Sequence, residues 1–539
     1  MQLNGAEIVI ECLKEQGVDT VFGYPGGAIL NVYDELYKHR DEIRHILTSH
    51  EQGAAHAADG YARATGKVGV CLATSGPGAT NLVTGIATAY MDSIPIVIFT
   101  GQVKSSLIGR DVFQEVDITG CTEPFIKHSY LLQNPKDFPR IVKEAFYIAR
   151  TGRPGPVLID LPMDFQDAQI DFNYPKKADI PGYKPTIKGH IGQIKRAIKL
   201  LLNSKRPLIC TGGGVHLGQA KEELAYMIEK SHIPMVHTLM GTGTLDTYSP
   251  YNLGMIGSHG YYHANWALKH ADTILFIGAR IADRAVANAG ILDEKANIIH
   301  IDIDPAEIGK MTAAHIPVVG DVKEVLRVMN ELIKTSETKE WIETILNHKK
   351  KTADIKYEHS INPKTVIKTL SNLLDDEAII TADVGQNQFW TMRNMEIKGN
   401  RQILCSGGFG TMGYSLPACI GAAIGNKSRK VVGVFGDGSF QMSFFELGTL
   451  VQEHVNPIMI LFNNSGLGMV REIQRKLETK EYGVGLPKNP NFAAIVRAYG
   501  IEAYRIDDPD KVEEILKQAI ASGKPQFLEF IVSDKESTL

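Results

Sequence analysis

The sequence has few of the features that mark secreted, membrane-bound and nucleic-acid-binding proteins. Six of its 539 residues are cysteine, and none of them forms a CxxC pair. A disulfide framework or a zinc site is therefore not expected, and this cysteine usage fits the reducing cytoplasm. No apolar run approaches the ~20 residues that a membrane helix needs. The formal net charge is −4 and no long basic block occurs, so neither a membrane nor a nucleic-acid partner is expected.

The first apolar stretch is not expected to be a secretory signal. It contains Glu7, Glu11 and Lys14, whereas the apolar region of a signal peptide is free of such charges. A cytoplasmic protein is therefore expected.

The remaining composition is that of an ordinary globular protein. Hydrophobic residues make up 44% of the chain and charged residues 22%, which is the usual balance. The length exceeds what one hydrophobic core serves, so three domains are expected. Strand-like apolar runs alternate with helical patterns throughout, and this alternation predicts parallel α/β layers.

The alternation divides into three blocks, and each is predicted to be a doubly wound parallel-sheet domain of the α/β class. They span residues 1–185, 188–345 and 361–539. A Pro- and Lys-rich linker ends the first block, and a charged, polar stretch at 335–360 leads out of the second. The strands predicted most clearly are Val68–Ala73, Ile94–Thr100, Pro156–Asp160, Pro207–Thr211, Thr273–Ile277, Ile298–Ile303, Ala378–Ala382, Val431–Phe435, Pro457–Phe462 and Gln526–Ile531.

Two polar motifs follow neighbouring strands of the third block. Gly436-Asp437-Gly438 comes directly after the strand at 431–435, and Asn463-Asn464 ends the next strand, about one βαβ unit later. Ligands of open α/β sheets bind at the carboxyl ends of strands, and glycine lets the backbone approach an anion closely. Mg²⁺ prefers oxygen ligands and shares them with phosphates. Each motif alone also reads as an ordinary turn after a strand, but their joint arrangement favours a metal-bound phosphate.

This arrangement resembles the thiamine diphosphate-dependent enzyme superfamily, whose motif is GDG followed by NN. The resemblance implies that Asp437, Asn464 and the carbonyl of Gly466 hold the metal, a magnesium ion. It also implies that the segments around these ligands contact the diphosphate, namely Gly436, Gly438, Ser439, Leu467, Gly468 and Met469.

The same resemblance implies that a carboxylate in an apolar site activates the cofactor by sharing a proton with its aminopyrimidine ring. Glu51, in Thr48-Ser49-His50-Glu51-Gln52-Gly53, matches that residue, and small apolar residues follow it. An acidic residue in the first turn of a helix is the simpler interpretation of Glu51 alone. The nearby stretch Ala73-Thr74-Ser75-Gly76-Pro77-Gly78, also typical of the family, favours the catalytic role.

Further matches extend the expected cofactor site. Met412, in a Gly-rich loop, matches the apolar wedge that bends the cofactor, although methionine is often a filler in such loops. The family often has histidine where this chain has Asn387, an exchange that keeps hydrogen bonding but loses a titratable group. The other residues that the resemblance assigns to the cofactor here are Pro25, Gly26, Thr74, Gly385, Gln386 and Gly410.

Over nearly its whole length the chain resembles the acetohydroxyacid (acetolactate) synthase catalytic subunit. The markers are Gly23-Tyr24-Pro25-Gly26-Gly27, Gly101-Gln102-Val103, Phe113-Gln114-Glu115, Lys127-His128 and Gly152-Arg153-Pro154-Gly155-Pro156. Such an enzyme decarboxylates pyruvate on thiamine diphosphate and transfers the hydroxyethyl unit to a second 2-oxoacid, here expected to be pyruvate, as in branched-chain amino acid biosynthesis. Gly27 and Gln114 would line the catalytic pocket, and Phe113 the substrate site.

The middle block resembles the FAD-binding domain of this family, in which FAD is structural and does no net redox chemistry. Glycines and carboxylates at strand ends suit a dinucleotide, although they also occur in ordinary βα turns. Arg284 would additionally receive the acceptor's carboxylate, because the guanidinium fork pairs two oxygens. A surface ion pair with Asp283 is the alternative. The residues assigned to FAD are Arg153, His259, Gly260, Gly278, Arg280, Arg284, Asp302, Ile303 and Asp321.

The chain departs from the family pattern on the acceptor side. Ile473 stands where the family usually has a tryptophan that favours 2-oxobutanoate, and a contact of this kind is worth ~1–3 kcal/mol in discrimination. Weak or absent 2-oxobutanoate preference is therefore expected. Met163 replaces a lysine near the substrate channel. The chain stops at Ser537-Thr538-Leu539, where family members usually continue with a closing tail, so a more open site is expected.

These departures leave alternatives to acetolactate synthesis. One is a related thiamine diphosphate-dependent 2-oxoacid decarboxylase, carboligase or C–C lyase with another acceptor. Another is a non-catalytic binding or regulatory protein that keeps the fold. The family resemblance further implies a homodimer or tetramer with active sites between chains, and a small regulatory subunit as a further expected partner.

Overall fold

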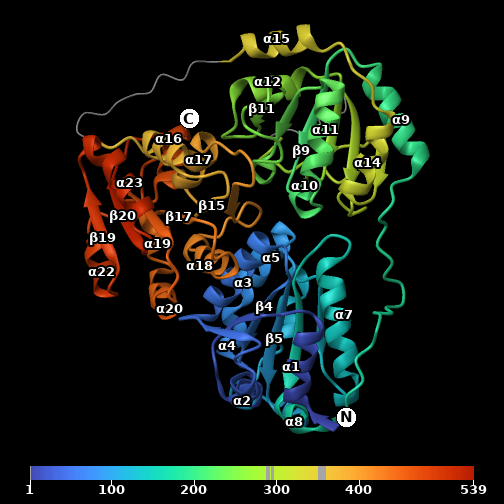
Figure 1. Ribbon diagram of the computed structural model, residues 1–539, viewed down its shortest axis with the longest axis vertical. Coiled ribbons are helices and arrows are strands. Elements are labelled where there is room, and N and C mark those ends of the chain that lie inside the picture. The colour runs from blue at the N-terminus through green and yellow to red at the C-terminus, as the bar shows by residue number, and fades with distance from the viewer. Residues whose placement is uncertain (1, 287–291, 293–295, 350–359, 539) are drawn as a thin grey trace. The chain divides into compact units, whose positions relative to one another are not determined.

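The computed structural model describes residues 2–286, 292, 296–349 and 360–538. Most of the predicted connecting stretch beyond residue 349, and Leu539, lie outside these residues. Three six-stranded parallel sheets, each wrapped by helices, confirm the predicted α/β class (Figure 1). Each of the ten predicted strands is present, with ends shifted by at most two residues. Within the described residues, no helix has the length and apolar character needed to cross a membrane.

The N-terminal sheet has the strand order β3-β2-β4-β5-β7-β6. Alternate residues of its strands feed two separate cores, because successive side chains of a strand point to opposite faces. Val70 and Leu72 pack with helices α1 and α7, whereas Cys71 packs with α3 and α5. The elements are β2 (Thr20–Gly23), β3 (Arg44–Leu47), β4 (Gly69–Ala73), β5 (Ile96–Gln102), β6 (His128–Leu131), β7 (Val157–Pro162), α1 (Gly5–Glu15), α2 (Leu30–Lys38), α3 (Glu51–Thr65), α4 (Pro77–Asn81), α5 (Val83–Asp92), α6 (Ile118–Thr122), α7 (Phe138–Arg150) and α8 (Met163–Asp167), with a small antiparallel pair β1 (Gln2–Asn4) and β8 (Gln169–Asp171).

The middle sheet has the order β11-β10-β9-β12-β13-β14. Numbered within the domain this is 3-2-1-4-5-6, the order typical of dinucleotide-binding folds. Its elements are β9 (Pro207–Thr211), β10 (Met235–His237), β11 (Asn252–Met255), β12 (Thr273–Ile277), β13 (Asn297–Asp302), β14 (Ile316–Val319), α9 (Ile191–Leu202), α10 (Gly214–Leu217), α11 (Lys221–Ser231), α12 (Tyr262–His270), α14 (Val322–Leu332) and α15 (Lys339–Asn347).

The C-terminal sheet has the order β16-β15-β17-β18-β20-β19. Numbered within the domain this is 2-1-3-4-6-5, the same order as in the N-terminal sheet. The elements are β15 (Ile379–Ala382), β16 (Gln402–Cys405), β17 (Val431–Gly436), β18 (Ile458–Asn463), β19 (Glu502–Ile506), β20 (Gln526–Ile531), α16 (Pro363–Leu373), α17 (Gln386–Asn394), α18 (Ser415–Gly425), α19 (Asp437–Phe440), α20 (Leu447–Gln452), α21 (Gly468–Lys476), α22 (Phe492–Ala498) and α23 (Val512–Ala521).

The N-terminal and C-terminal sheets belong to one compact unit, and the middle sheet to a second. Within the first unit, α3 and α18 share one hydrophobic core. A Cβ on Gly60 would lie 2.2 Å from the carbonyl oxygen of Ala418, and one on Gly421 would lie 1.9 Å from that of Ala57. The two helices therefore approach so closely that only glycine fits at these crossings. The predicted domain boundaries themselves stay predictions.

Candidate active site

The two motifs of the C-terminal domain lie at one edge of its sheet. Strands β17 and β18 are parallel neighbours, with Gly436 opposite Phe462. Asp437 and Asn464 directly follow these strands, and both are buried, Asp437 to 2% exposure. The sequence therefore places a carboxylate and an amide side by side where the carboxyl ends of parallel strands meet.

The Asp437 carboxylate is surrounded by donors. Its Oδ1 accepts the backbone N–H of Gly438 at 3.0 Å, and its Oδ2 accepts Gly466 N–H at 3.0 Å and Asn489 Nδ2 at 2.6 Å. Burial raises the pKa of Asp437 to about 6, against the lowering effect of these hydrogen bonds. Its charge is therefore incompletely compensated by the protein alone, and a bound cation would stabilise it.

Asn464 has one paired and one unpaired polar atom. Its Nδ2 donates to Gln386 Oε1 at 2.9 Å. Its Oδ1 is buried and has no hydrogen-bond partner among the residues that the structure describes. An orphaned buried oxygen is costly unless something else binds it. A metal ion fits this atom, because amide and carboxylate oxygens are the ligands that Mg²⁺ takes.

Gln386 fixes which way the Asn464 amide points. Its Nε2 donates to Glu472 Oε2 at 2.9 Å and to the carbonyl of Glu536 at 2.8 Å, which leaves Oε1 to accept from Asn464. The described residues contain no group of three or more His, Cys, Asp and Glu side chains that could hold a metal.

Glycines keep this edge open to a phosphate. A Cβ on Gly468 would lie 2.0 Å from Gln386 Oε1 and 2.4 Å from Asn464 Nδ2, so a side chain there would break the Gln386–Asn464 contact. A Cβ on Gly438 would lie 2.6 Å from Leu467 Cδ2. Ser439 Oγ donates to the carbonyl of Gly436 at 3.1 Å and so closes the first turn of α19.

Met412 reaches the same edge from the loop after β16. Its Cε lies 3.6 Å from the position that a Cβ on Gly438 would occupy, and the loop turns at Gly410 with φ +74°. Asp383, fully buried, holds this loop by accepting the backbone N–H groups of Gly413 and Ser415, each at 3.0 Å. Met412 is therefore fixed beside the predicted diphosphate segment.

The loop after β15 joins this group. Gly385 has φ +137°, and Asn387 Nδ2 donates to the carbonyl of Asp383 at 2.9 Å. Asn387 Oδ1 lies 3.6 Å from the position of a Cβ on Gly436. The structure thus brings the predicted cofactor residues of the C-terminal domain together, and Met469 lies in the first turn of the adjoining helix α21.

Glu51 is the first residue of α3 and lies in a small buried group of the N-terminal domain. The residue is only 8% exposed, and its Oε2 accepts a hydrogen bond from Asn81 Nδ2 at 2.9 Å. A Cβ on Gly78 would lie 3.2 Å from Glu51 Oε1 and 2.7 Å from Thr74 Cγ2. A Cβ on Gly26 would lie 2.5 Å from the same Thr74 methyl. Glu51, Thr74 and Gly26 therefore lie close together.

The predicted pocket residues lie on neighbouring loops. Phe113 is 87% exposed, and Pro25 and Gly27 are also exposed. Gln114 has φ +59°, and its carbonyl oxygen would lie 2.9 Å from a Cβ on Gly76. The Phe113–Gln114 loop therefore packs closely against Gly76 and leaves the apolar Phe113 ring exposed.

In the middle domain, the predicted FAD residues lie mainly at strand ends. Gly278 follows β12 with φ +53°, and its Cβ would lie 2.7 Å from Gly214 Cα. His259, next to Gly260, stacks on Phe389 with ring centroids 3.9 Å apart. Half-buried Arg280 lies in the same segment as Gly278, and Asp302 and Ile303 end β13 and follow it. Asp321 caps α14 by accepting the Glu324 N–H at 3.1 Å.

Two arginines predicted to bind ligands make other contacts in this structure. Arg153 belongs to the N-terminal domain, and its Nε donates to Ser93 Oγ at 2.8 Å. The Arg284 side chain is 81% exposed, and its Nε lies 3.9 Å from Asp283 Oδ2. This is the surface pair that the sequence offers as the alternative for Arg284, and a pair so exposed contributes little to stability.

Some residues in or near the site are not part of any sequence motif that would predict their position. Asn489 donates to Asp437 from a loop of the pattern Lys-Asn-Pro-Asn, which on its own predicts only a turn. Met163, the departure from the family pattern, is the first residue of α8 and is half-buried. Ile473 is 39% exposed on α21, and the apolar Val470 on the same helix and Leu477 at its end are exposed as well.

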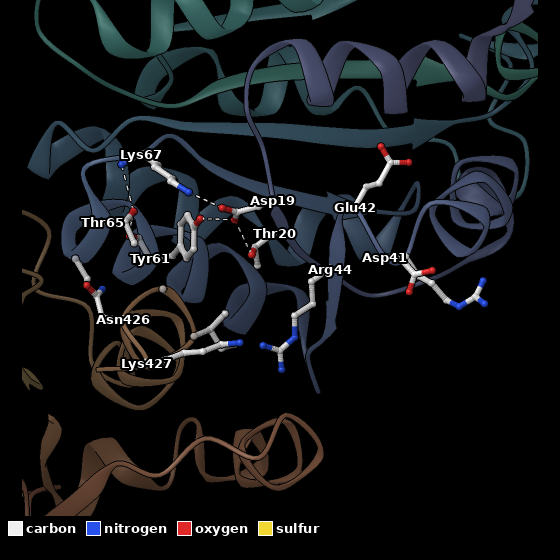
Figure 2. Close-up of a pocket in the computed structure, with 14 residues that line it drawn as sticks. Asp19, Thr20, Asp41, Glu42, Arg44, Tyr61, Thr65, Lys67, Asn426 and Lys427 are labelled. Carbon is white, nitrogen blue, oxygen red and sulfur yellow. Dashed lines mark hydrogen bonds and ion pairs between the residues drawn. The ribbon is translucent and has the colours of Figure 1, made fainter. Parts of the chain in front are cut away.

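A cavity in the same unit lies away from this site. Its lining comes from the ends of α3 and α18 and from the β2 and β3 region, and none of the predicted site residues belongs to it (Figure 2). Figure 2 shows Lys67 and Tyr61 directed at Asp19. Arg44, which also lines the cavity, pairs with Glu453 at 2.5 Å. These paired charges neutralise one another, and we assign the cavity no part in catalysis.

Asp160 is a buried carboxyl group behind the pocket loops. Its Oδ1 accepts Thr100 Oγ1 at 2.6 Å and its Oδ2 accepts Gln102 Nε2 at 2.9 Å. Gln102 Nε2 also donates to the carbonyl of Val116, at 2.8 Å. Burial raises the pKa of Asp160 to about 7, against these hydrogen bonds.

This shift predicts a pH dependence of stability. Above pH ~4 the unfolded chain releases the Asp160 proton, whereas the folded chain keeps it to about pH 7. The free energy of unfolding should therefore fall across this window, by at most about 4 kcal/mol. Asp160→Asn should remove that fall, which melting temperatures of both proteins between pH 4 and 8 would reveal. Parallel curves for the two proteins would contradict the assignment.

Comparison with known proteins agrees with this arrangement. The family model described as thiamine pyrophosphate enzyme, N-terminal TPP binding domain, matches residues 3–121. The model for the central domain of thiamine pyrophosphate enzymes matches residues 194–329, and that for the C-terminal TPP binding domain matches residues 383–530.

Curated relatives match over almost the whole chain. A probable acetolactate synthase large subunit of Methanococcus aeolicus is 44% identical over 100% of this chain and 93% of its own length. The acetolactate synthase large subunit of Buchnera aphidicola subsp. Schizaphis graminum is 44% identical over 99% of this chain and 95% of its own length. That of Lactococcus lactis subsp. lactis is 42% identical over 99% and 94%. The chain therefore belongs to the acetolactate synthase large-subunit family of thiamine pyrophosphate enzymes.

Proposed function

We propose that this chain is a thiamine diphosphate- and Mg²⁺-dependent acetolactate synthase that joins two molecules of pyruvate with loss of carbon dioxide. The relatives named above support the activity. The observation that carries the cofactor assignment is the orphaned, buried Asn464 Oδ1 beside the donor-crowded Asp437 carboxylate. A metal ion that carries the diphosphate would bind both oxygen groups and so give the Asn464 oxygen a partner.

The C-terminal domain would hold the metal and the diphosphate. Asp437, Asn464 and the carbonyl of Gly466 would bind Mg²⁺, and the backbone around Gly438 and Gly468 would face the phosphates, because a side chain at either glycine collides with its neighbours. When bound, thiamine diphosphate supplies the carbanion that attacks a 2-oxoacid and accepts the electrons released with carbon dioxide. Met412 would support the bound cofactor from the loop after β16, because its Cε lies 3.6 Å from the position of a Cβ on Gly438.

Glu51 would hold the proton that activates the cofactor. Asn81 donates to Oε2 at 2.9 Å, which leaves Oε1 as the oxygen that gains and loses this proton. The group around Oε1 is small and apolar, with the Thr74 methyl and Gly78 beside it.

Pyruvate would bind between the loops that carry Gly27 and Phe113–Gln114 and the helix α21, which carries Ile473. Gly27, Gln114 and Phe113 would line the donor side, and Ile473 the acceptor side, with Arg284 receiving the acceptor carboxylate. The Arg284 guanidinium is accessible to a ligand, because its side chain is 81% exposed and its pair with Asp283 is 3.9 Å long.

The middle domain would bind FAD as a structural group. Its 3-2-1-4-5-6 strand order is that of dinucleotide-binding sheets, whose ligands lie at the carboxyl ends of strands. Gly278 and Asp302 lie at two such ends. Redox chemistry has no place in the proposed reaction, so FAD would serve to hold the domain in shape.

The assembly would be at least a homodimer, or a tetramer, with active sites between chains. Phe113 is 87% exposed on the N-terminal domain, and Tyr482 is 87% and Leu477 69% exposed on the C-terminal domain. These large apolar side chains, exposed on both domains, would be available to contact a second chain. Because the relatives are named large subunits, a small regulatory subunit is a further proposed partner. All six cysteines are free, five of them buried, which suits the cytoplasm.

The acceptor side yields a prediction about specificity. Ile473 presents a smaller apolar surface than tryptophan, so the chain should discriminate weakly between pyruvate and 2-oxobutanoate as acceptors. Ile473→Trp should raise the preference for 2-oxobutanoate by ~10-fold or more, because one methylene contact is worth ~1–3 kcal/mol. Competition between the two acids, with both products quantified, measures the ratio. Leu477→Trp, one turn further along at the end of α21, serves as the control and should leave the ratio unchanged. A strong 2-oxobutanoate bias in the unsubstituted chain would contradict the prediction.

The function itself is tested by incubating the chain with pyruvate, Mg²⁺ and thiamine diphosphate, with and without FAD, and identifying the products. Acetolactate is the expected product, and its formation should depend on both Mg²⁺ and thiamine diphosphate. Acetaldehyde alone would instead identify a 2-oxoacid decarboxylase on the same scaffold. No product at all would favour a non-catalytic member of the family.

A further inference from the structure

The N-terminal and C-terminal domains each carry one buried carboxylate that binds the backbone of the other domain. Asp92 is the last residue of α5, and its side chain is fully buried. Glu446 ends the short 3-10 helix η6 (Phe444–Glu446), and the residue is 1% exposed. Neither residue belongs to the metal or cofactor sets described above.

Asp92 holds the start of the loop that carries Met412. Its Oδ1 accepts the backbone N–H of Gly408 at 2.7 Å, and its Oδ2 accepts that of Gly407 at 3.1 Å. The same Oδ2 accepts Arg63 Nη2 at 2.9 Å, and Arg63 Nη1 donates to the carbonyl of Cys405 at 3.0 Å. Asp92 and its partner Arg63 thus bind this loop at three places along its chain.

A second contact of α5 extends this hold toward Met412. Thr88 Oγ1 lies 2.6 Å from Thr411 Oγ1, and both side chains are buried. The loop is therefore pinned both at its beginning and at the residue directly before Met412.

Glu446 holds the segment directly before Glu51. Its Oε1 accepts the backbone N–H of His50 and its Oε2 that of Ser49, each at 3.1 Å. Thr449 Oγ1 also donates to Oε2, at 2.7 Å. A Cβ on Gly53 would lie 2.0 Å from Glu446 Oε1, so the glycine is what lets the carboxylate reach the beginning of α3.

The two contacts have the same design. In each, one oxygen accepts one backbone N–H, and the other accepts the neighbouring backbone N–H along the chain together with a side-chain donor. Both carboxylates come from the connection between the third and fourth strands of their domains, β4 to β5 and β17 to β18. Both targets precede the helix that joins the second strand to the third, α3 or α18. The sheets share one strand order, so the pair is related by the internal similarity of the two domains.

We propose that Asp92 and Glu446 are positioning residues that form a reciprocal clamp, in which each domain holds the other domain's cofactor-facing segment. Glu446 fixes the backbone that aims Glu51, and Asp92 fixes the backbone that aims Met412. The catalytic meaning of these segments rests on the proposed function, but the clamp itself is a property of the folded chain.

Charge makes the clamp sensitive to amide substitution. The groups that contact the four carboxylate oxygens in these hydrogen bonds are all donors. In Glu446→Gln or Asp92→Asn, an NH₂ group must therefore face a backbone N–H, which breaks at least one hydrogen bond without changing side-chain size. Burial raises the pKa of Glu446, against the donors that favour its charged form.

Hydrogen exchange of the full chain, followed by mass spectrometry with and without thiamine diphosphate and Mg²⁺, tests the proposal. In Glu446→Gln, peptides covering 47–53 should exchange at least ~10-fold faster, and in Asp92→Asn those covering 404–413 should do so. Each effect should appear on the domain opposite the substitution. The thiamine diphosphate concentration for half-saturation, read from protein fluorescence, should rise in both variants.

Three further variants decide between a clamp and a general loss of stability. Gly53→Ala should reproduce the Glu446→Gln pattern, and the milder Thr88→Val should loosen 404–413 if Asp92→Asn fails to fold. Glu144→Gln, a matched buried carboxylate of α7 that accepts Arg140 and Tyr130, should change neither segment. Faster exchange throughout the chain, or unchanged exchange in the opposite segment, would overturn the clamp. Exchange is measured without pyruvate, so a failure to make acetolactate would refute the proposed function and leave this result standing.

Discussion

A Glu51→Gln variant is expected to lose turnover by about 10³-fold or more, since a positioned proton-transfer group contributes about 10²–10⁴-fold and no second carboxyl is proposed to replace it. Glutamine keeps the size of the side chain and can still accept the Asn81 hydrogen bond, which is 2.9 Å long in this structure. It cannot hold a titratable proton at the position of Oε1. The rate of acetolactate formation at saturating pyruvate measures the loss.

The same variant should bind its cofactor and unfold almost as the parent does. Glu51 begins α3 and is 8% exposed, but its hydrogen bond from Asn81 survives the exchange. Thiamine diphosphate binding and melting temperature should therefore change little. Glu144→Gln, another buried carboxylate of the same domain, should retain turnover. Full turnover in Glu51→Gln would remove this residue from the mechanism, and lost cofactor binding would make its role structural.

The fold could be predicted where strands are continuous apolar runs. Strands such as β9 (Pro207–Thr211) and β12 (Thr273–Ile277) are buried along their whole length, and parallel strands covered on both faces have this pattern. Strands β6 (His128–Leu131) and β19 (Glu502–Ile506) at sheet edges are not predicted, because β6 has no buried residue and β19 buries only Ala503 and Ile506. The β-propensity of these short segments is too weak to predict a strand, and they become strands by pairing with the neighbouring strand of the sheet.

The site could be predicted where its chemistry is local in the sequence. Asp437 and Asn464 each follow a recognisable strand, so their meeting follows from parallel topology alone. Asn489 reaches Asp437 from a loop that no strand pattern places, and Glu446 reaches Ser49 across two domains. Such contacts depend on tertiary packing, which no local pattern encodes. The exposure of Arg284 likewise depends on how its loop folds, which the residue types around it do not reveal.

An Asp437→Asn variant is expected to raise the Mg²⁺ concentration for half-saturation by more than about 100-fold, a loss beyond that usual for residues that merely support a metal ligand. The substitution removes the negative charge from the proposed metal set. It also places an NH₂ group against the donors of Gly466 and Asn489, which lie 3.0 and 2.6 Å from Oδ2. Thiamine diphosphate binding, titrated by fluorescence over a range of Mg²⁺ concentrations, should weaken in parallel because metal and diphosphate are bound together.

Two companion variants separate metal binding from local folding. Asn489→Ala keeps the charge and removes one donor, so it should weaken Mg²⁺ binding by only about 10-fold. Asp272→Asn in the middle domain also loses a carboxylate that accepts backbone N–H groups, from Lys205 at 3.0 Å and Arg206 at 3.1 Å, and should leave the Mg²⁺ dependence unchanged. Unaltered Mg²⁺ dependence in Asp437→Asn would mean that the orphaned Asn464 Oδ1 serves another ligand. An equal loss in Asp272→Asn would instead trace the effect to general destabilisation, because that carboxylate has no proposed contact with the metal.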